Sequence, residues 1–161
     1  MTDIGLAVLR LAIAWVFVAH GMHKLFSFWS GGGVGPGGLT ATAEHLTALG
    51  FPSPAILAIV AGVTQLAGGA LVGVGLLTRF AASALLGYVL LGVVTEHLRW
   101  GFFLNWVNDP TRGHGMEYAI VLMSALLLFV LAGGGDFSID GRRSHSAAAR
   151  AAGRARLRNR P

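Results

Sequence analysis

Four long apolar stretches dominate the chain, and shorter polar segments separate them. They cover residues 4–26, 55–77, 80–97 and 117–133. A hydrocarbon core about 30 Å thick is crossed by roughly 17–25 helical residues, so each stretch is long enough to be a candidate membrane span. The pattern therefore predicts an all-α membrane protein built as a four-transmembrane-helix bundle.

The segments outside these stretches complete the predicted organisation. Residues 1–141 form the transmembrane domain, and residues 142–161 form a basic tail that we expect to be disordered. Between the first two spans, a glycine-rich loop over residues 31–38 precedes a mixed polar and apolar stretch over residues 39–50. This stretch is compatible with a short helix at the membrane interface.

The composition supports a membrane protein and limits its chemistry. Only 12% of the 161 residues are charged, about half the roughly 25% typical of soluble domains. The chain has no cysteine, which excludes a cysteine redox centre, covalent c-type haem and cysteine-ligated metals. Any redox role must therefore pass electrons through a bound cofactor or a partner protein.

The net positive charge lies in the tail. Residues 1–133 hold five basic and five acidic side chains, whereas residues 134–161 hold seven arginines and two aspartates. With Arg79 in the turn between the second and third spans, this distribution predicts that both termini are cytoplasmic. The tail arginines suit anionic lipid or an acidic soluble partner. Nucleic acid is not an expected partner, because no aromatic residue lies among the basic residues after residue 141.

Glycines on the second predicted span favour close helix packing. Gly69 and Gly73 form a GxxxG step, which lets two helix backbones approach closely in a membrane. We expect this step to pack within the bundle; a dimer face is the alternative.

Polar residues gather at the predicted outer end of three spans. They are His20, Lys24, Glu96, His97 and Glu117. A charged residue at bilayer depth costs about 2.5–3.5 kcal/mol, so each requires a partner or a function. The cluster suggests a pocket for a small ligand headgroup, with Lys24 or His20 donating to a carbonyl oxygen and Glu96 or Glu117 exchanging protons.

Three other interpretations of this cluster remain open. The side chains can simply extend toward the interface, with Glu96 paired to Arg99 one turn along. His20 and His97 could bind a metal with a carboxylate, or could ligate haem from opposite sides. Neither is the expectation, because no HxxxH or HxxE pair lies on a single helix and both histidines lie near the outer edge.

A second polar pair lies deeper in the membrane. Arg10 is two turns into the first span, and Gln65 is near the middle of the second. Their depths differ by less than about 10 Å, which an extended arginine can bridge. The alternative is a structural role in which Arg10 reaches the cytoplasmic headgroups near Asp3.

Several motifs resemble those of the DoxX family of small bacterial membrane proteins. The similar stretches are Leu9-Arg10-Leu11, His20-Gly21-Met22-His23-Lys24-Leu25-Phe26, Leu49-Gly50-Phe51-Pro52, Gly68-Gly69, Gly75-Leu76-Leu77-Thr78-Arg79 and Gly115-Met116-Glu117-Tyr118-Ala119. The resemblance covers residues 4–141. The family pattern usually has an acid before the paired glycines of the second span, where this chain has Gln65.

The resemblance implies a multi-pass protein of the bacterial plasma membrane with a redox association. Members of the family are linked to thiosulfate:quinone oxidoreductase, and others to membrane complexes that handle oxidative or thiol stress. The leading hypothesis is therefore a quinone-linked accessory or subunit of a membrane oxidoreductase complex. A non-catalytic scaffold for soluble or membrane redox enzymes is the alternative. A small-solute or proton transporter is the third hypothesis, although no inverted repeat or broken helix supports it.

Overall fold

The computed structural model describes residues 2–30 and 37–158, and every regular element in these ranges is helical. Most of the predicted glycine-rich loop, residues 31–36, lies outside them. A π-helical turn, η1, and a 3₁₀ turn, η2, continue α4. In chain order the elements are α1 (Thr2–Phe26), α2 (Gly38–Ala48), α3 (Pro54–Val74), α4 (Thr78–Gly92), η1 (Val93–His97), η2 (Leu98–Trp100), α5 (Glu117–Ala132) and α6 (Ile139–Arg158).

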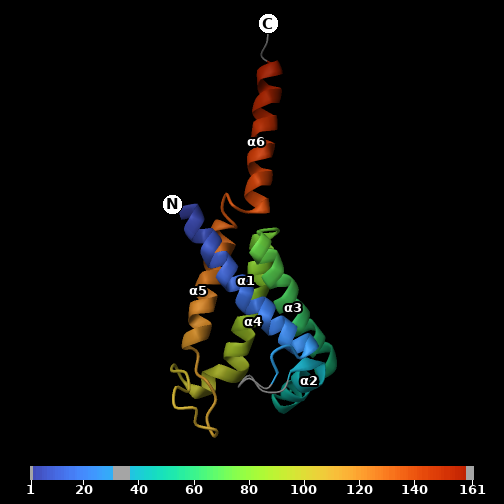
Figure 1. The fold of residues 1–161 in the computed structure, drawn as a ribbon, viewed down its shortest axis with the longest axis vertical. Coiled ribbons are helices and arrows are strands. Elements are labelled where there is room, and N and C mark those ends of the chain that lie inside the picture. Colours follow the sequence, from blue (N-terminus) through green and yellow to red (C-terminus); the bar gives the residue numbers. More distant parts are fainter. Residues whose placement is uncertain (1, 31–36, 159–161) are drawn as a thin grey trace.

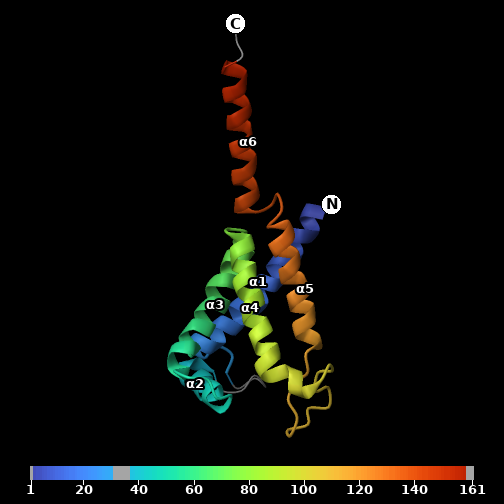
Figure 2. The ribbon, with the colours of Figure 1, turned by 180° about the vertical axis from the view of Figure 1, so that it is seen from behind.

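The four apolar helices α1, α3, α4 and α5 pack together with alternating direction (Figure 1). The N-terminus, the α3–α4 turn and α6 lie at one end of this bundle. The short helix α2, predicted over residues 39–50, and the loop of residues 101–116 lie at the other end, as Figure 2 also shows. The all-helical prediction is therefore confirmed, and the chain enters and leaves the bundle at the same end.

Three of the bundle helices are long and apolar enough to cross a membrane. They are Asp3–Phe26, Pro54–Val74 and the continuous segment Thr78–Trp100. Helix α5 is also apolar but has 16 residues, which is about 24 Å of helix. The chain is thus a multi-pass membrane protein with three helices of spanning length and one shorter apolar helix among the described residues.

Glycines bring α1 and α3 into close contact. A Cβ atom on Gly21 would lie 2.5 Å from the backbone nitrogen of Leu66, and one on Gly69 would lie 2.9 Å from Cβ of Phe17. A Cβ on Gly73 would lie 3.0 Å from Cβ of Ala14. The GxxxG step therefore packs α3 against α1 inside the chain, as expected, because lipid leaves close dispersion contact as a main force between helices.

Arg10 does not form the predicted pair with Gln65. Its side chain is 4% exposed and donates three hydrogen bonds to backbone carbonyls. Nε donates to Gly73 O at 3.2 Å, Nη1 to Gly134 O at 2.5 Å and Nη2 to Phe137 O at 2.8 Å. Gln65 is 5% exposed, and its Oε1 has no partner among the described residues.

The reason for this correction lies at the helix ends. The last carbonyls of a helix lack intrahelical donors and carry partial negative charge, which favours a cation. Arg10 faces the C-terminal part of α3 and the segment that follows α5, so one guanidinium satisfies carbonyls from two places. A glutamine could offer it only one acceptor.

Asp140 joins the C-terminal segment to the start of α4. Its carboxylate accepts hydrogen bonds from the backbone nitrogens of Leu77 and Thr78, at 3.1 and 2.8 Å, and from Thr78 Oγ1 at 2.9 Å. Burial favours the neutral acid, but these hydrogen bonds outweigh it and lower the pKa of Asp140. The carboxylate thus holds the α3–α4 turn and the base of α6 together.

The expected disorder of the tail is wrong for most of its length, because residues Ile139–Arg158 form helix α6. The helix extends away from the bundle along the long axis of the molecule (Figure 1). Alanine and arginine favour helix strongly, and Asp140 in the first turn complements the helix dipole. The high charge had favoured disorder, but local helix propensity and the fixed first turn favour the helix.

Replacement of Arg10 should destabilise the bundle. In Arg10→Met, carbonyls at the ends of α3 and α5 lose their donors, so we expect the free energy of unfolding to fall by about 2–4 kcal/mol. Chemical unfolding in detergent would measure it. Arg79→Met, at an exposed position in the first turn of α4, is the control and should change stability little. Equal effects of the two substitutions would contradict the role of Arg10.

Candidate functional site

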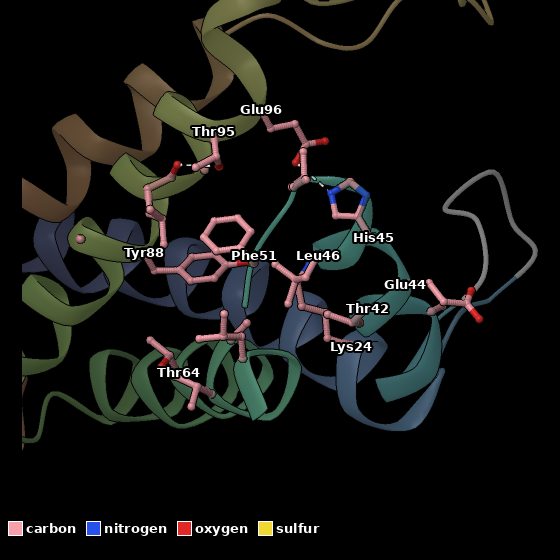
Figure 3. A pocket seen from close by; sticks show the side chains of 18 of the residues that line it. Lys24, Thr42, Glu44, His45, Leu46, Phe51, Thr64, Tyr88, Thr95 and Glu96 are labelled. Carbon is pink, nitrogen blue, oxygen red and sulfur yellow. Dashed lines mark hydrogen bonds and ion pairs between the residues drawn. The ribbon is translucent and has the colours of Figure 1, made fainter. Parts of the chain in front are cut away.

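A cavity of about 710 Å³ lies between α2, α3 and α4, beside the end of α1 (Figure 3). Its volume is within the range of roughly 300–1,000 Å³ that is usual for ligand pockets. Along α4 and η1, the lining positions repeat every three or four residues and therefore form one helix face. These positions are Ala84, Gly87, Tyr88, Leu91, Gly92, Thr95 and Glu96.

One end of the cavity is polar. Lys24 reaches it from α1, His45 from α2 and Glu96 from η1. His45 Nε2 lies 3.1 Å from Glu96 Oε2, so this pair joins α2 to the end of the third spanning segment. Glu44, the next residue of α2, points away from His45 and Glu96 (Figure 3).

Lys24 is the distinctive group at this end. Across residues 2–30 and 37–158, no hydrogen bond or ion pair to its ammonium is formed, although Glu96 lines the same cavity. Lys24 is half-buried, and its ammonium can donate to a ligand oxygen in the cavity. Lys24 is therefore a donor without an acceptor among the described residues at the polar end of the cavity.

The other end of the cavity is mostly apolar. Val60, Ala61 and Thr64 contribute from α3, and Ala84 and Gly87 contribute from α4. The hydroxyl of Tyr88 adds a polar group between the two ends. The cavity thus combines an apolar lining with a few polar groups at one end, which is the usual arrangement for orienting an amphipathic ligand.

The structure divides the predicted outer cluster. Lys24 and Glu96 do line one cavity, but His20, His97 and Glu117 do not. His20 is exposed on α1, and Nδ1 of His97 lies 2.9 Å from the carbonyl oxygen of His114. Within the described ranges, no three metal-binding side chains come together, so the His20–His97 metal site is not formed.

Glu117 fastens the loop of residues 101–116 instead of facing the cavity. Its Oε1 accepts hydrogen bonds from the backbone nitrogen of Leu104 at 2.9 Å and from Trp106 Nε1 at 3.0 Å. The backbone nitrogen of Glu117 also donates to Phe102 O at 2.9 Å. The separation follows from the loop itself, which folds over the start of α5 and engages the carboxylate there.

The predicted Glu96–Arg99 pair is replaced by two separate interactions. Glu96 pairs with His45, while the guanidinium of Arg99 lies 5.0 Å from the ring centroid of Trp100. The positions of His45 and Tyr88 in the site were missed from the sequence. The signals were a histidine on the polar face of a short helix and a lone tyrosine inside a span, and neither specifies a contact across the bundle.

Fold and cavity together define a class: a small multi-pass helical membrane protein with a polar-ended cavity between its helices. The DoxX family profile matches residues 5–98, more than half of the chain, and the protein belongs to this family. The match includes the first three spanning segments and the Lys24, His45 and Glu96 side chains.

Two relatives extend the similarity along the chain. Inner membrane protein YphA of Escherichia coli is 26% identical over 137 residues, covering 85% of this chain and 89% of that protein. Uncharacterized membrane protein Rv3486 of Mycobacterium tuberculosis is 30% identical over 144 residues, covering 88% of this chain and 82% of that protein. No solved structure matches the chain significantly.

Removal of the Glu117 carboxylate should loosen the loop without affecting the cavity. In Glu117→Ala, two donors of the loop lose their acceptor, at about 1–3 kcal/mol of local stability. Hydrogen exchange of residues 101–116, followed by mass spectrometry, should become at least several-fold faster. Glu117→Gln retains an acceptor oxygen and should restore most of the protection. Unchanged exchange in Glu117→Ala would contradict this assignment.

Proposed function

We propose that the protein is a quinone-linked accessory or subunit of a membrane oxidoreductase complex, and that a quinone headgroup binds in the cavity between α2, α3 and α4. The observation that carries this proposal is the Lys24 ammonium, which has no acceptor among the described residues and lies at the polar end of a cavity that is otherwise largely apolar. A quinone has a flat apolar ring and carbonyl oxygens that accept hydrogen bonds. Its ring suits the apolar lining of the cavity, and its oxygens suit the donors at the polar end.

The cavity offers suitable groups for such a headgroup. The Lys24 ammonium and the Tyr88 hydroxyl can donate to carbonyl oxygens, and the Glu96 carboxylate can accept from a hydroxyl. Quinone, when bound, would supply the two-electron chemistry that the cysteine-free chain lacks. The chain's own residues would bind and orient the ring and hold a proton at Glu96 or His45.

The same proposal places the protein in the bacterial plasma membrane, with α5 as a fourth span and both termini in the cytoplasm. The name of the Escherichia coli relative as an inner membrane protein supports the location. The positive-inside distribution supports the orientation. The alternating direction of α1, α3, α4 and α5 supports a fourth crossing (Figure 1).

Single cysteines test this topology directly, since the chain has no cysteine of its own. In intact cells with the outer layers made permeable, a membrane-impermeant maleimide should label Val107→Cys in the loop of residues 101–116. It should not label Ala151→Cys on α6, which should react only after the plasma membrane is opened. Labelling of both in intact cells would mean that α5 does not cross, because α6 would then lie outside.

Quinone content tests the proposed ligand. Purified protein should retain near-stoichiometric quinone, well above the amount carried by its co-purified phospholipid. Lys24→Met should lower this content at least tenfold, because a hydrogen bond to a charged group contributes about 1.5–3 kcal/mol; Glu96→Gln should lower it less. Glu117→Gln is the matched control, because this carboxylate lies outside the cavity, and should retain wild-type content. Unchanged retention in Lys24→Met would refute the site.

A second candidate function is a membrane scaffold for redox enzymes. Helix α6 favours it, because this helix projects from the bundle and exposes Arg142, Arg143, Arg150 and Arg154. Background quinone in the wild-type protein would overturn the quinone proposal and favour the scaffold.

A further inference from the structure

We propose that the cavity is filled from within the bilayer, through a slot between α3 and α4 at Gly87, and that its ligand is a lipid-phase amphipath with an apolar chain. The identity of the headgroup as a quinone rests on the proposed function. The slot and the chain rest on separate observations about the cavity wall.

The first observation is the direction of the polarity gradient. The lining of α4 and η1 runs for roughly 18 Å, from Ala84 to Glu96. Glu96 lies at the end of the bundle that carries α2, whereas Ala84 lies in the third spanning segment, closer to its middle. A ligand that fills this length therefore has its polar group at the interface and an apolar part inside the hydrocarbon region.

The second observation is that protein leaves several side chains of this part of the cavity uncovered. Val60 of α3 and Leu91 of α4 line the cavity, yet their side chains are 53% and 50% exposed. Ala84 and Gly87 are also both lining and exposed. Because these positions lie on spanning helices and protein does not cover them, we infer that lipid chains reach the cavity between α3 and α4.

The third observation concerns glycines that packing does not explain. A Cβ atom on Gly87 or Gly92 would meet no heavy atom within 4 Å. By contrast, a Cβ on Gly62 or Gly68 would lie within 3.0 Å of a leucine side chain. Glycine weakens a helix relative to alanine. Helix packing does not require a glycine at position 87, and we infer that Gly87 leaves room for the apolar chain of a ligand.

These observations favour a ligand with an apolar chain over a purely water-soluble ligand. Such a ligand would use the polar end near Lys24, His45 and Glu96 and would leave the lipid-facing half without a function. A chain of methylene or isoprene units crossing Gly87 uses both halves, because it buries apolar surface against Val60 and Leu91 while the headgroup reaches Lys24.

Tail length supplies the test. The protein, reconstituted in phosphatidylcholine nanodiscs, would be titrated with decylubiquinone and with the same ring lacking a tail, at matched fractions in the lipid. Gly87→Leu fills the slot without a clash and should weaken decylubiquinone binding at least tenfold, with the tail-less ring affected little. Gly5→Leu is the matched control, because a Cβ there also meets nothing within 4 Å and Gly5 does not line the cavity. Lys24→Met should weaken both ligands.

Each other result has a definite meaning. If Gly87→Leu binds both ligands as the wild type does, the slot is refuted while the quinone site stands. If the wild type binds neither, a phosphatidylcholine with a diazirine in its acyl chain becomes the probe. Labelling of residues 57–64 and 84–91 that falls in Gly87→Leu would uphold the slot and refute the quinone. Labelling unaffected by that variant would refute both.

Discussion

One end of this bundle depends on the hydrogen bonds that the Arg10 guanidinium donates. Within the hydrocarbon region water cannot satisfy a backbone carbonyl or solvate a charge, so both must find partners in the protein. Arg10 meets both requirements by donating to the carbonyls of Gly73, Gly134 and Phe137. It thereby joins α1 to the end of α3 and to the segment after α5. Asp140 adds a second connection, from that segment to the start of α4.

This fastening explains why the cavity forms at the opposite end. Near the α3–α4 turn the two helices are held together, and Gly68 lets Leu85 approach α3 closely. Toward α2 the helices diverge, as both ribbon views show. The space is bounded by α2 and by the His45–Glu96 pair, which provide polar groups but do not fill it. A bundle that is closed at one end and splayed at the other thus produces a polar-ended cavity without any broken helix.

Hydropathy was sufficient to predict the four apolar helices, but not the polar helix α6 or which polar residues meet. The stretch over residues 80–97 predicts a span because apolar content and length are local properties, and α4 with η1 occupies it. The contact between His45 and Glu96 depends on how α2 docks, which no local pattern contains. Likewise, Glu117 shares the level of Lys24 in a linear reading but is engaged by its own loop. The sequence therefore predicted how deep each polar residue lies along its helix. Which neighbouring helix or cavity its side chain faces could be seen only in the packed structure.

The two cations of α1 have different surroundings in the structure. Arg10 and Lys24 both carry a positive charge in α1, and the sequence alone gives each a similar status. Arg10 is buried and donates hydrogen bonds to three backbone carbonyls. Lys24 lines a cavity together with Glu96 and forms no hydrogen bond or ion pair with any described residue. A polar group without a partner in a membrane is costly, and a ligand oxygen at Lys24 would lower that cost, which is why the proposed site centres on this residue.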